Sequence, residues 1–388
     1  MVMKRNGFLF TMSLTLSIVN ALISQCESAH ASMAMKYNTW ELSPNGQTAA
    51  ISSSIWGAQE ESPHYRVWVV GLSQRKVETL IVIQNAYAPK YSPAGDTLGY
   101  VHAINRIAFP PGNSDTRISL LSLEDKSGKE LTTGYADQQP AWSDDGSTIA
   151  FARILRNKPG MQVYVTDKME GDGFTSPHGL GDTHSAIAGL AWRPTHDEIA
   201  YVATKLHLES YESGTGRTRT FDIILVDIAG NVRTITSSGD VGPKSVCWSP
   251  GGRYAAYVRE TAYLVNKPGS GGNFAKLVMI QPDSKGYHEV VTASEIGCGP
   301  LRVGNLRWSP DGRQIVFDVL TLDEAAKTDI ASVEWASGEF RWLTRDGKSK
   351  LPRWSSDGRT IMYVRADSQI WRVNADGTRN QKVYNLED

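Results

Sequence analysis

The sequence predicts an all-β protein, a seven-bladed β-propeller built from four-stranded antiparallel blades. Three observations support this fold class. A five-residue pattern of the type Trp-Ser-Pro-Asp-Gly occurs seven times, and a short apolar segment typical of a strand follows each copy. Successive copies are about 46 to 60 residues apart, which is the length of one blade with loop insertions.

The seven copies of the pattern predict tight turns between consecutive strands. They occupy residues 42–46, 91–95, 142–146, 192–196, 248–252, 308–312 and 354–358. Proline fixes φ and glycine tolerates positive φ, so Ser-Pro-Asp-Gly favours a hairpin turn that the Ser or Asp oxygen can stabilise. The Trp before the turn has a large apolar face, which we expect to pack between neighbouring blades.

Each repeat is predicted to contain three further strands after the turn. The strand directly after the turn is expected at residues 48–51, 97–101, 148–152, 198–202, 254–258, 314–318 and 360–364. A third strand follows, for example at 117–121, and a fourth after another Gly- and Asp-rich turn, for example at 129–133. The last repeat includes an outer strand of its own at 382–386, so a strand supplied by the N-terminus is not needed to close the ring, although residues 33–37 could add one.

The repeat resembles a known family. The pattern Trp-Ser-Pro-Asp-Gly-x-x-Ile-x-Phe/Tyr, with Val-Asn-Ala-Asp-Gly at 373–377, resembles the TolB-like, or WD40-like (PD40), propeller repeat over residues 37–388. The resemblance implies the propeller fold. TolB proteins have an α/β domain before a six-bladed ring, and prolyl-oligopeptidase-like enzymes add a hydrolase domain. We expect neither here, so the resemblance implies little about function.

The first 31 residues are predicted to be a signal peptide. Lys4 and Arg5 precede an apolar stretch at 8–23, and Ala29-His30-Ala31 fits the small-x-small cleavage pattern. We expect cleavage after Ala31, a propeller domain at 32–388, and a periplasmic or secreted protein. The alternatives are an uncleaved membrane anchor or a lipoprotein attached at Cys26, although the bulky Gln25 disfavours the latter. Membrane contact is expected only through an uncleaved signal peptide.

Composition excludes some partners and leaves the cysteines open. The formal net charge is −1, so the basic excess expected of a nucleic-acid-binding protein is missing. After cleavage Cys247 and Cys298 remain, and their positions in the repeat differ, so a disulfide and two free thiols are equally compatible with the sequence. We expect a monomer.

The elaborated face of the ring is the predicted binding surface. The links between second and third strands are long in six repeats, at 52–65, 102–116, 153–160, 203–221, 259–275 and 319–328, whereas the Pro-Gly turns on the other face are minimal. Arginines and aromatic residues, which are common in binding hot spots, occur in these links. The candidate partner- or ligand-binding residues are Arg106, Phe109, Arg156, His207, Tyr211, Arg217, Arg219, Arg259, Tyr263 and Lys267. Any one of them could instead be a solvated loop residue.

No catalytic motif is recognisable. Residues 269–272 only approach the Gly-x-Ser-x-Gly elbow of serine hydrolases, and no helix follows them. His178 and His184 lack a third metal ligand, and Asp144 and Asp145 sit in a turn position. Acidic residues at 323, 324 and 329 are expected to be solvated. We therefore predict no cofactor and no metal site.

The leading functional hypothesis is a non-catalytic propeller that binds a protein or envelope component through its long-loop face. The alternative is an enzyme, a lyase or hydrolase acting on carbohydrate or peptide at the channel mouth. Residues before each turn would line that mouth: Gln138, Gln139, Lys244, Arg302, Arg307 and Lys350. A positively charged channel without acidic groups would favour binding of an anionic ligand over hydrolysis.

Overall fold

The computed structural model describes the chain from Met35 to Asn385 with internal gaps. The described residues are 35–55, 64–72, 77–104, 115–133, 136–156, 159–169, 173–211, 214–236, 241–263, 272–283, 287–291, 301–321 and 327–385. They form strands and turns, with no helix long and apolar enough to cross a membrane among them. The predicted signal peptide lies outside the described residues.

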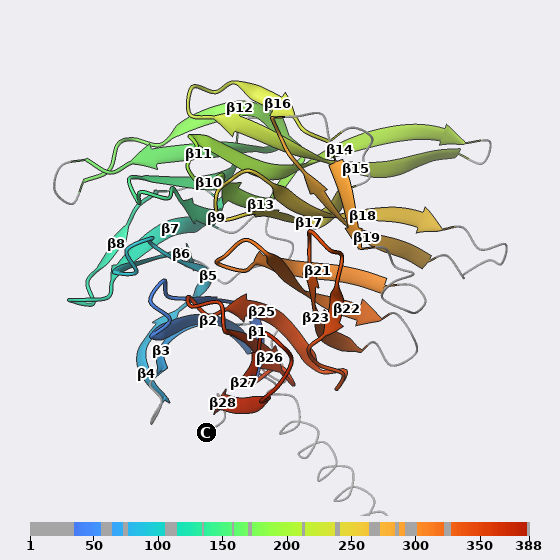
Figure 1. Cartoon of the computed structure of the whole chain (residues 1–388). Helices are drawn as coiled ribbons and strands as arrows, with labels where there is room; N and C mark the ends of the chain where they lie inside the picture. Colours follow the sequence, from blue (N-terminus) through green and yellow to red (C-terminus); the bar gives the residue numbers. More distant parts are fainter. Residues whose placement is uncertain are drawn as a thin grey trace, which may run out of the picture.

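The strands follow one another around a common axis (Figure 1). Sheet 1 contains β1 (Met35–Leu42), β2 (Thr48–Ile55), β3 (His64–Leu72) and β4 (Val77–Gln84). Sheet 2 contains β5 (Ala86–Tyr91), β6 (Thr97–Ala103), β7 (Thr116–Ser122), β8 (Gly128–Glu130), β9 (Ala136–Trp142), β10 (Thr148–Ile154), β11 (Met161–Asp167) and β12 (His178–His184). Sheet 3 contains β13 (Ala186–Trp192), β14 (Glu198–Tyr211), β15 (Gly214–Asp227) and β16 (Val232–Thr234).

Three further sheets complete the ring. Sheet 4 contains β17 (Val241–Trp248), β18 (Ala255–Tyr263), β19 (Gly272–Ile280) and β20 (Tyr287–Val291). Sheet 5 contains β21 (Leu301–Trp308), β22 (Gln314–Thr321), β23 (Thr328–Glu334) and β24 (Phe340–Trp342). Sheet 6 contains β25 (Ser349–Trp354), β26 (Thr360–Arg365), β27 (Gln369–Asn374) and β28 (Gln381–Asn385).

The predicted count of seven separate blades is wrong. Five sheets have four antiparallel strands, but the second and third repeats share the eight-stranded sheet 2. The two halves of sheet 2 join where β7 and β9 pair in parallel at Thr116 and Ala136. The Thr116 hydroxyl also donates to the carbonyl of Asp137 at 2.9 Å, which holds the two halves together.

The innermost strand of each repeat lines the axis, and these strands form a closed cycle. β1, β5, β9, β13, β17, β21 and β25 each contact the next, and β25 contacts β1. The cycle closes without strand exchange, because sheets 1 and 6 each consist of four consecutive strands. The predicted outer strand of the last repeat is confirmed as β28. The closing contact is made by Trp40, whose indole N–H donates to the carbonyl of Leu351 at 2.8 Å.

The core consists of clusters between neighbouring sheets. One of them joins sheets 1 and 6 through Trp40, Ile51, Met362 and Val364, and another joins sheets 4 and 5 through Met279, Phe317 and other buried residues. Alternate residues of the inner and second strands face opposite neighbours. Apolar residues on both faces therefore become buried, as in the run Ile199, Ala200, Tyr201, Val202 and Ala203.

The turns form a collar around one end of the axis, in which each turn leans on the previous one. The glycines have positive φ, for example 77° at Gly95 and 69° at Gly312. A Cβ atom added at Gly95 would lie 3.1 Å from Pro44 Cδ, and one at Gly312 would lie 3.5 Å from Pro250 Cδ. The Pro-Gly pattern therefore sets the packing between repeats as well as the local turn.

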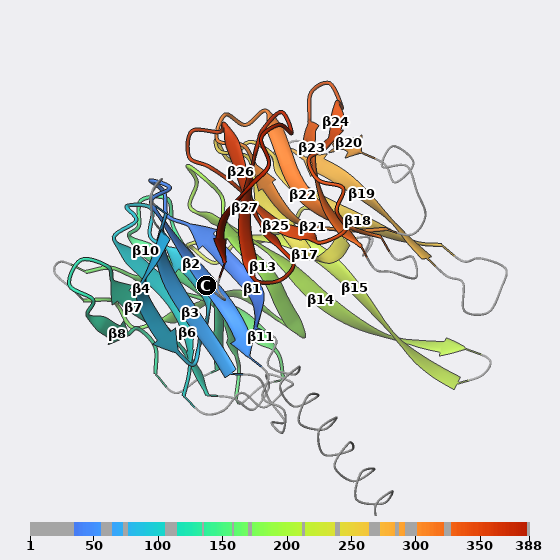
Figure 2. The same ribbon diagram turned by 90° about the horizontal axis from the view of Figure 1, so that it is seen from below.

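The expectation of long irregular links is wrong for residues 203–221. There β14 and β15 form a regular hairpin that runs to the pair Tyr211 and Gly214 and projects from the body of the molecule (Figure 2). β18 and β19 likewise extend to the pair Tyr263 and Gly272. The physical reason is local sequence. Alternation such as Leu206-His207-Leu208-Glu209, and the threonines of 215–220, favour extended backbone over an irregular loop.

Candidate functional site

The inner strands bend where a residue adopts positive φ three positions before the aromatic residue of the turn pattern. These residues are Ala88, Gln139, Gly189, Asn305 and Leu351, with φ between 51° and 62°. Each lies at or beside a register shift in the pairing of its strand with the next. β-Bulges of this kind redirect the side chains that follow them. In this chain the following residues line the axis.

The position directly before the aromatic or aliphatic residue of the turn pattern supplies the side chains at the axis. We call six of them, which line two axial cavities, the axial ring: Glu41, Lys90, Ala191, Cys247, Arg307 and Arg353. The Trp of the following repeat anchors this position. Trp142 donates its indole N–H to the Lys90 carbonyl at 3.2 Å, and Trp354 donates to the Arg307 carbonyl at 3.1 Å. Trp308 makes the same bond to the Cys247 carbonyl at 3.0 Å.

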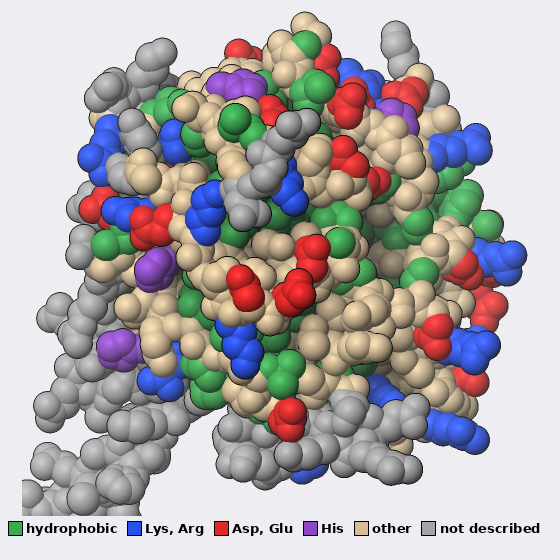
Figure 3. Space-filling model, turned by 90° about the vertical axis from the view of Figure 1, so that its left-hand side faces the viewer, with side chains coloured by type: hydrophobic (Ala, Val, Ile, Leu, Met, Phe, Trp, Pro, Cys, Tyr) green, Lys and Arg blue, Asp and Glu red, His purple; other side chains and the backbone are tan. Residues whose placement is uncertain are grey.

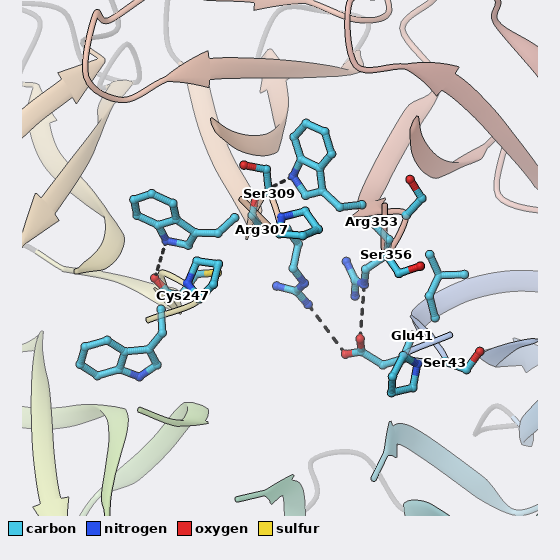
Figure 4. Close-up of a pocket in the computed structure, with 15 residues that line it drawn as sticks. Glu41, Ser43, Cys247, Arg307, Ser309, Arg353 and Ser356 are labelled. Carbon is cyan, nitrogen blue, oxygen red and sulfur yellow. Dashed lines mark hydrogen bonds and ion pairs between the residues drawn. The ribbon is translucent and has the colours of Figure 1, made fainter. Parts of the chain in front are cut away.

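One carboxylate of the axial ring faces three cations. Lys90 Nζ forms an ion pair with Glu41 Oε1, and Arg307 Nη2 lies 3.9 Å from the same oxygen. Arg353 Nε lies 3.6 Å from Glu41 Oε2. Figure 4 shows the two guanidinium groups converging on Glu41, with Cys247 on the other side of Arg307. The ring therefore has more positive than negative charge.

The pKa values of these groups follow from burial and mutual attraction. Burial alone would raise the pKa of Glu41, but Lys90, Arg353 and Arg307 together outweigh it and hold that pKa at about 2. Burial lowers the pKa of Lys90, against the attraction of Glu41. Burial and the nearby Arg307 lower the pKa of Arg353 to about 10. The positive charges of this group repel one another, and an anion bound beside them would relieve that repulsion.

Asp318 holds two strands of the axial ring in place through hydrogen bonds. Its Oδ2 accepts hydrogen bonds from Asn305 Nδ2 at 2.7 Å and from the backbone N–H of Leu351 at 3.0 Å. Burial raises the pKa of Asp318. Because both partners are bulge residues, Asp318 fixes the bends of β21 and β25 that direct Arg307 and Arg353 toward the axis.

Two cavities meet at the axial ring. The first, of about 350 Å³, reaches the collar of turns, since Ser43, Pro44 and Pro310 line it together with Arg307 and Arg353. The second, of about 400 Å³, lies along the inner strands and is lined by Lys90 on one side and by Leu190, Ala191 and other apolar residues on the other. Glu41, Cys247 and Arg307 line both cavities. A ligand that enters past the turns would therefore meet the charged part of the ring.

Most of the predicted long-loop residues are not brought together by what the structure describes. Arg106, Phe109 and Lys267 lie outside the described residues. Arg156 is exposed and pairs with Asp115 at 2.9 Å, and Arg259 Nη2 lies 3.4 Å from the Tyr257 hydroxyl. His207, Tyr211, Arg217 and Arg219 lie on the β14–β15 hairpin, and Tyr263 ends β18. The long-loop binding face stays a prediction.

The channel-mouth residues were predicted only in part. Arg307 and Gln139 line the second cavity. Lys350 instead pairs with Asp367, Gln138 is not among the lining residues of either cavity, and Arg302 is exposed at the start of β21. The side chain of Lys244 lies outside the described part. Glu41, Lys90 and Arg353 were missed. The signal was in the sequence, because all three occupy the same repeat position as Arg307.

The other predicted sites have structural roles among the described residues. Asp145 accepts from the Ser143 and Ser147 hydroxyls, and Asp144 Oδ2 accepts from the Thr195 N–H at 2.9 Å, which links two turns. His184 Nε2 lies 3.0 Å from the Tyr201 hydroxyl. Within the described ranges, no three His, Cys, Asp or Glu side chains gather as metal ligands. Cys247 is a free thiol there, whereas Cys298 lies outside them.

The face of the molecule drawn in Figure 3 contrasts with the axis. Figure 3 looks onto the side that carries β4 and β8, and there basic, acidic and hydrophobic side chains are mixed rather than gathered by charge. The concentration of cations in the axial ring is therefore a local feature and not a sample of a generally basic protein. This agrees with the formal net charge of −1.

No protein-family model matches the sequence, and no curated protein matches it. Solved structures do resemble the chain. The β-propeller domain of the Trilobed protease from Pyrococcus furiosus, described as having an open velcro topology, superposes with a TM-score of 0.62 at 12% identity over 91% of this chain and 97% of that one. The fold is a β-propeller. The propeller closes without strand exchange, through contacts between β1 and β25.

Two further propeller structures support the same conclusion. An oligogalacturonate lyase in complex with manganese gives a TM-score of 0.58 at 13% identity, over 86% of this chain and 87% of that one. An acylaminoacyl peptidase from Pyrococcus horikoshii gives 0.60 at 10% identity, over 92% of this chain and 53% of the peptidase. At these identities the likeness shows the fold alone. The TolB structures superpose with a TM-score of 0.44, which is too low to support an argument.

Proposed function

We propose that this protein is an exported, non-catalytic propeller that binds an anionic group of a protein or envelope component in its axial ring. One observation carries the proposal: Lys90, Arg307 and Arg353 converge on the single carboxylate of Glu41. Positive charge held in an enclosed site attracts anions more strongly than the same charge on an open surface. The cavity that reaches the collar of turns supplies an entrance.

The protonation state of Glu41 favours binding over hydrolysis. A general acid or base works best with a pKa near the working pH. Glu41, whose pKa is held at about 2, stays ionised at neutral pH and is a poor proton donor or acceptor there. The site is therefore better suited to holding an anion than to hydrolysing a bond.

The test is capture of partners from an envelope extract on immobilised protein. Arg307→Gln removes one cation of the axial ring and is expected to lose the captured component. Arg341→Gln is the matched control, because the side chain of Arg341 is 44% exposed and forms a surface ion pair with Glu339 at 2.9 Å. Equal capture by both variants would contradict the proposal. A variant with residues 206–219 deleted and the strands rejoined tests the long-loop face separately.

The second candidate function is a lyase acting on an anionic carbohydrate. Lys90 favours it, because burial lowers the pKa of its ammonium group and brings it nearer to that of a useful base. Arg307 and Arg353 would neutralise a substrate carboxylate. Turnover of oligogalacturonate by the wild type, and its loss in Lys90→Met with binding retained, would support this candidate over simple binding.

Export completes the proposal. Residues 1–31 act as a signal peptide that is cleaved after Ala31, and the mature protein is released as a monomer into the periplasm or medium. Mass spectrometry of the exported protein is expected to give a chain that begins at Ser32. A chain that retains residues 1–31 in the membrane fraction would contradict cleavage.

A further inference from the structure

The charged and uncharged residues of the axial ring lie on opposite sides of the axis. Its charged members come from β21, β25, β1 and β5, which are consecutive around the axis and include the innermost strands of the first and last sheets. Its uncharged members, Ala191 and Cys247, come from β13 and β17 on the other side. One arc of the ring is therefore charged and the opposite arc is neutral.

The neutral arc continues into an apolar wall of the second cavity. We define this wall as Pro140, Leu190, Ala191 and Val246. Gln139 beside it uses its amide N–H to donate to the carbonyl of Ile187 at 2.9 Å, so this amide is already engaged in structure. An inorganic oxyanion bound at the cations would leave the wall in contact with water. A ligand with an aliphatic part would cover it and gain from its burial.

We infer that the axial site takes an amphipathic carboxylate. This rests on the proposed function. The carboxylate lies against Arg307, Arg353 and Lys90, and a short aliphatic group lies on the apolar wall. A volume of about 400 Å³ is larger than an inorganic oxyanion requires and leaves room for such a group. The same chemistry is offered by a free short-chain acid and by the C-terminus of a polypeptide that ends in an aliphatic residue.

Calorimetric titration with a graded series of ligands tests the inference. The probes are acetate, butanoate, hexanoate and inorganic phosphate at constant ionic strength. Burial of each methylene is expected to lower Kd about fourfold until the wall is covered. Hexanamide, which has the chain without the charge, is expected to bind at least tenfold more weakly than hexanoate.

Two variants separate the two halves of the site. Ala191→Leu fills the space beside the wall and is expected to weaken hexanoate at least tenfold while acetate binding is unchanged. Ala191→Ser nearly keeps the side-chain volume and replaces Ala191→Leu if the larger residue unfolds the protein. It makes the wall more polar, so Kd is expected to depend less on the chain length of the carboxylate. Arg307→Gln is expected to weaken the binding of every anion, and Arg341→Gln is expected to weaken none, because Arg341 pairs with Glu339 away from the axis. Circular dichroism and thermal melting verify that each variant is folded.

The source of the ligand is distinguished by a matched peptide pair. A pentapeptide ending in Leu with a free carboxylate is compared with its C-terminal amide. Binding of the acid form alone, at least as tight as hexanoate, identifies a polypeptide terminus, whereas binding of hexanoate alone identifies a free acid, and both outcomes support the inference. Anion binding that needs Arg307 but ignores chain length would overturn it and leave the proposed function standing. No binding of any anion would overturn both.

Discussion

Arg353 illustrates how single residues hold the site. Its Nε donates to the carbonyl of Trp40 at 3.0 Å and its Nη1 donates to the carbonyl of Pro352 at 2.8 Å. The guanidinium carbon lies 5.9 Å from the centre of the Trp40 ring. A guanidinium group so held loses little freedom on binding an anion, which is why arginine suits a preorganised site.

Glu41 is expected to make stability depend on pH. The pKa of its carboxyl group falls from 4.5 to about 2 on folding, so its stabilising contribution is complete above pH 4.5 and is lost as the pH falls toward 2. Glu41→Gln should therefore lower the free energy of unfolding at pH 7 by on the order of 2–3 kcal/mol. Urea unfolding at pH 7 and pH 3 measures this. A difference between the two proteins that stays constant over this range would contradict the assignment.

Gly252 is the turn residue least able to change. Its φ is 67°, and an added Cβ would lie 2.1 Å from the carbonyl oxygen of Pro194 in the preceding turn. Gly252→Ala is expected to lower the free energy of unfolding by more than about 2 kcal/mol, because strain in φ and a backbone clash add together. Gly338→Ala is the control. Its φ of 74° imposes the same backbone strain, but no atom lies within 4 Å of the added Cβ. Thermal or urea unfolding of the pair separates the two effects.

At the scale of elements, the strands and turns were predictable, and the site was predictable only in part. The repeated turn pattern locates the hairpins because Pro, Gly and Ser act through local geometry. The β14–β15 hairpin was missed because a polar, Thr-rich sequence is typical of a loop. Only the alternation of apolar and polar residues indicates strands there. Lys90, Glu41 and Arg353 share the repeat position of Arg307, so the sequence could have grouped them, but the bulges that direct this position toward the axis were not predicted. Ala88 and Leu351, for example, adopt positive φ although neither is a glycine.

The tryptophans offer a matched comparison at this scale. Trp308 donates its indole N–H to the Cys247 carbonyl at 3.0 Å, whereas the buried Nε1 of Trp248 has no hydrogen-bond partner among the described residues. Trp308→Phe is expected to cost about 1 kcal/mol more stability than Trp248→Phe, because it leaves a carbonyl unpaired. Urea unfolding of both variants gives the difference. Equal losses would show that packing alone decides.

For the whole molecule, ring closure and ligand binding should be coupled. The charged arc spans sheets 5, 6, 1 and 2, so a ligand there bridges the β1–β25 contact that closes the ring. A ligand at one hundred times its Kd is expected to add about 2.7 kcal/mol to the free energy of unfolding. Hydrogen exchange should slow most in β1 and β25. Protection confined to β13 and β17 would contradict a bridging position.

The closure of the ring has a consequence for the order in which the protein is made. Glu41 and Lys90 leave the ribosome before the strands that carry Arg307 and Arg353 have been synthesised. Until the last repeat docks on β1, Glu41 lacks its contact with Arg353, and the anion site is incomplete. Occupancy of the site would thus report that synthesis and closure are finished. A chain that ends before Arg353 is therefore expected not to bind the ligand, even where its first sheets are folded.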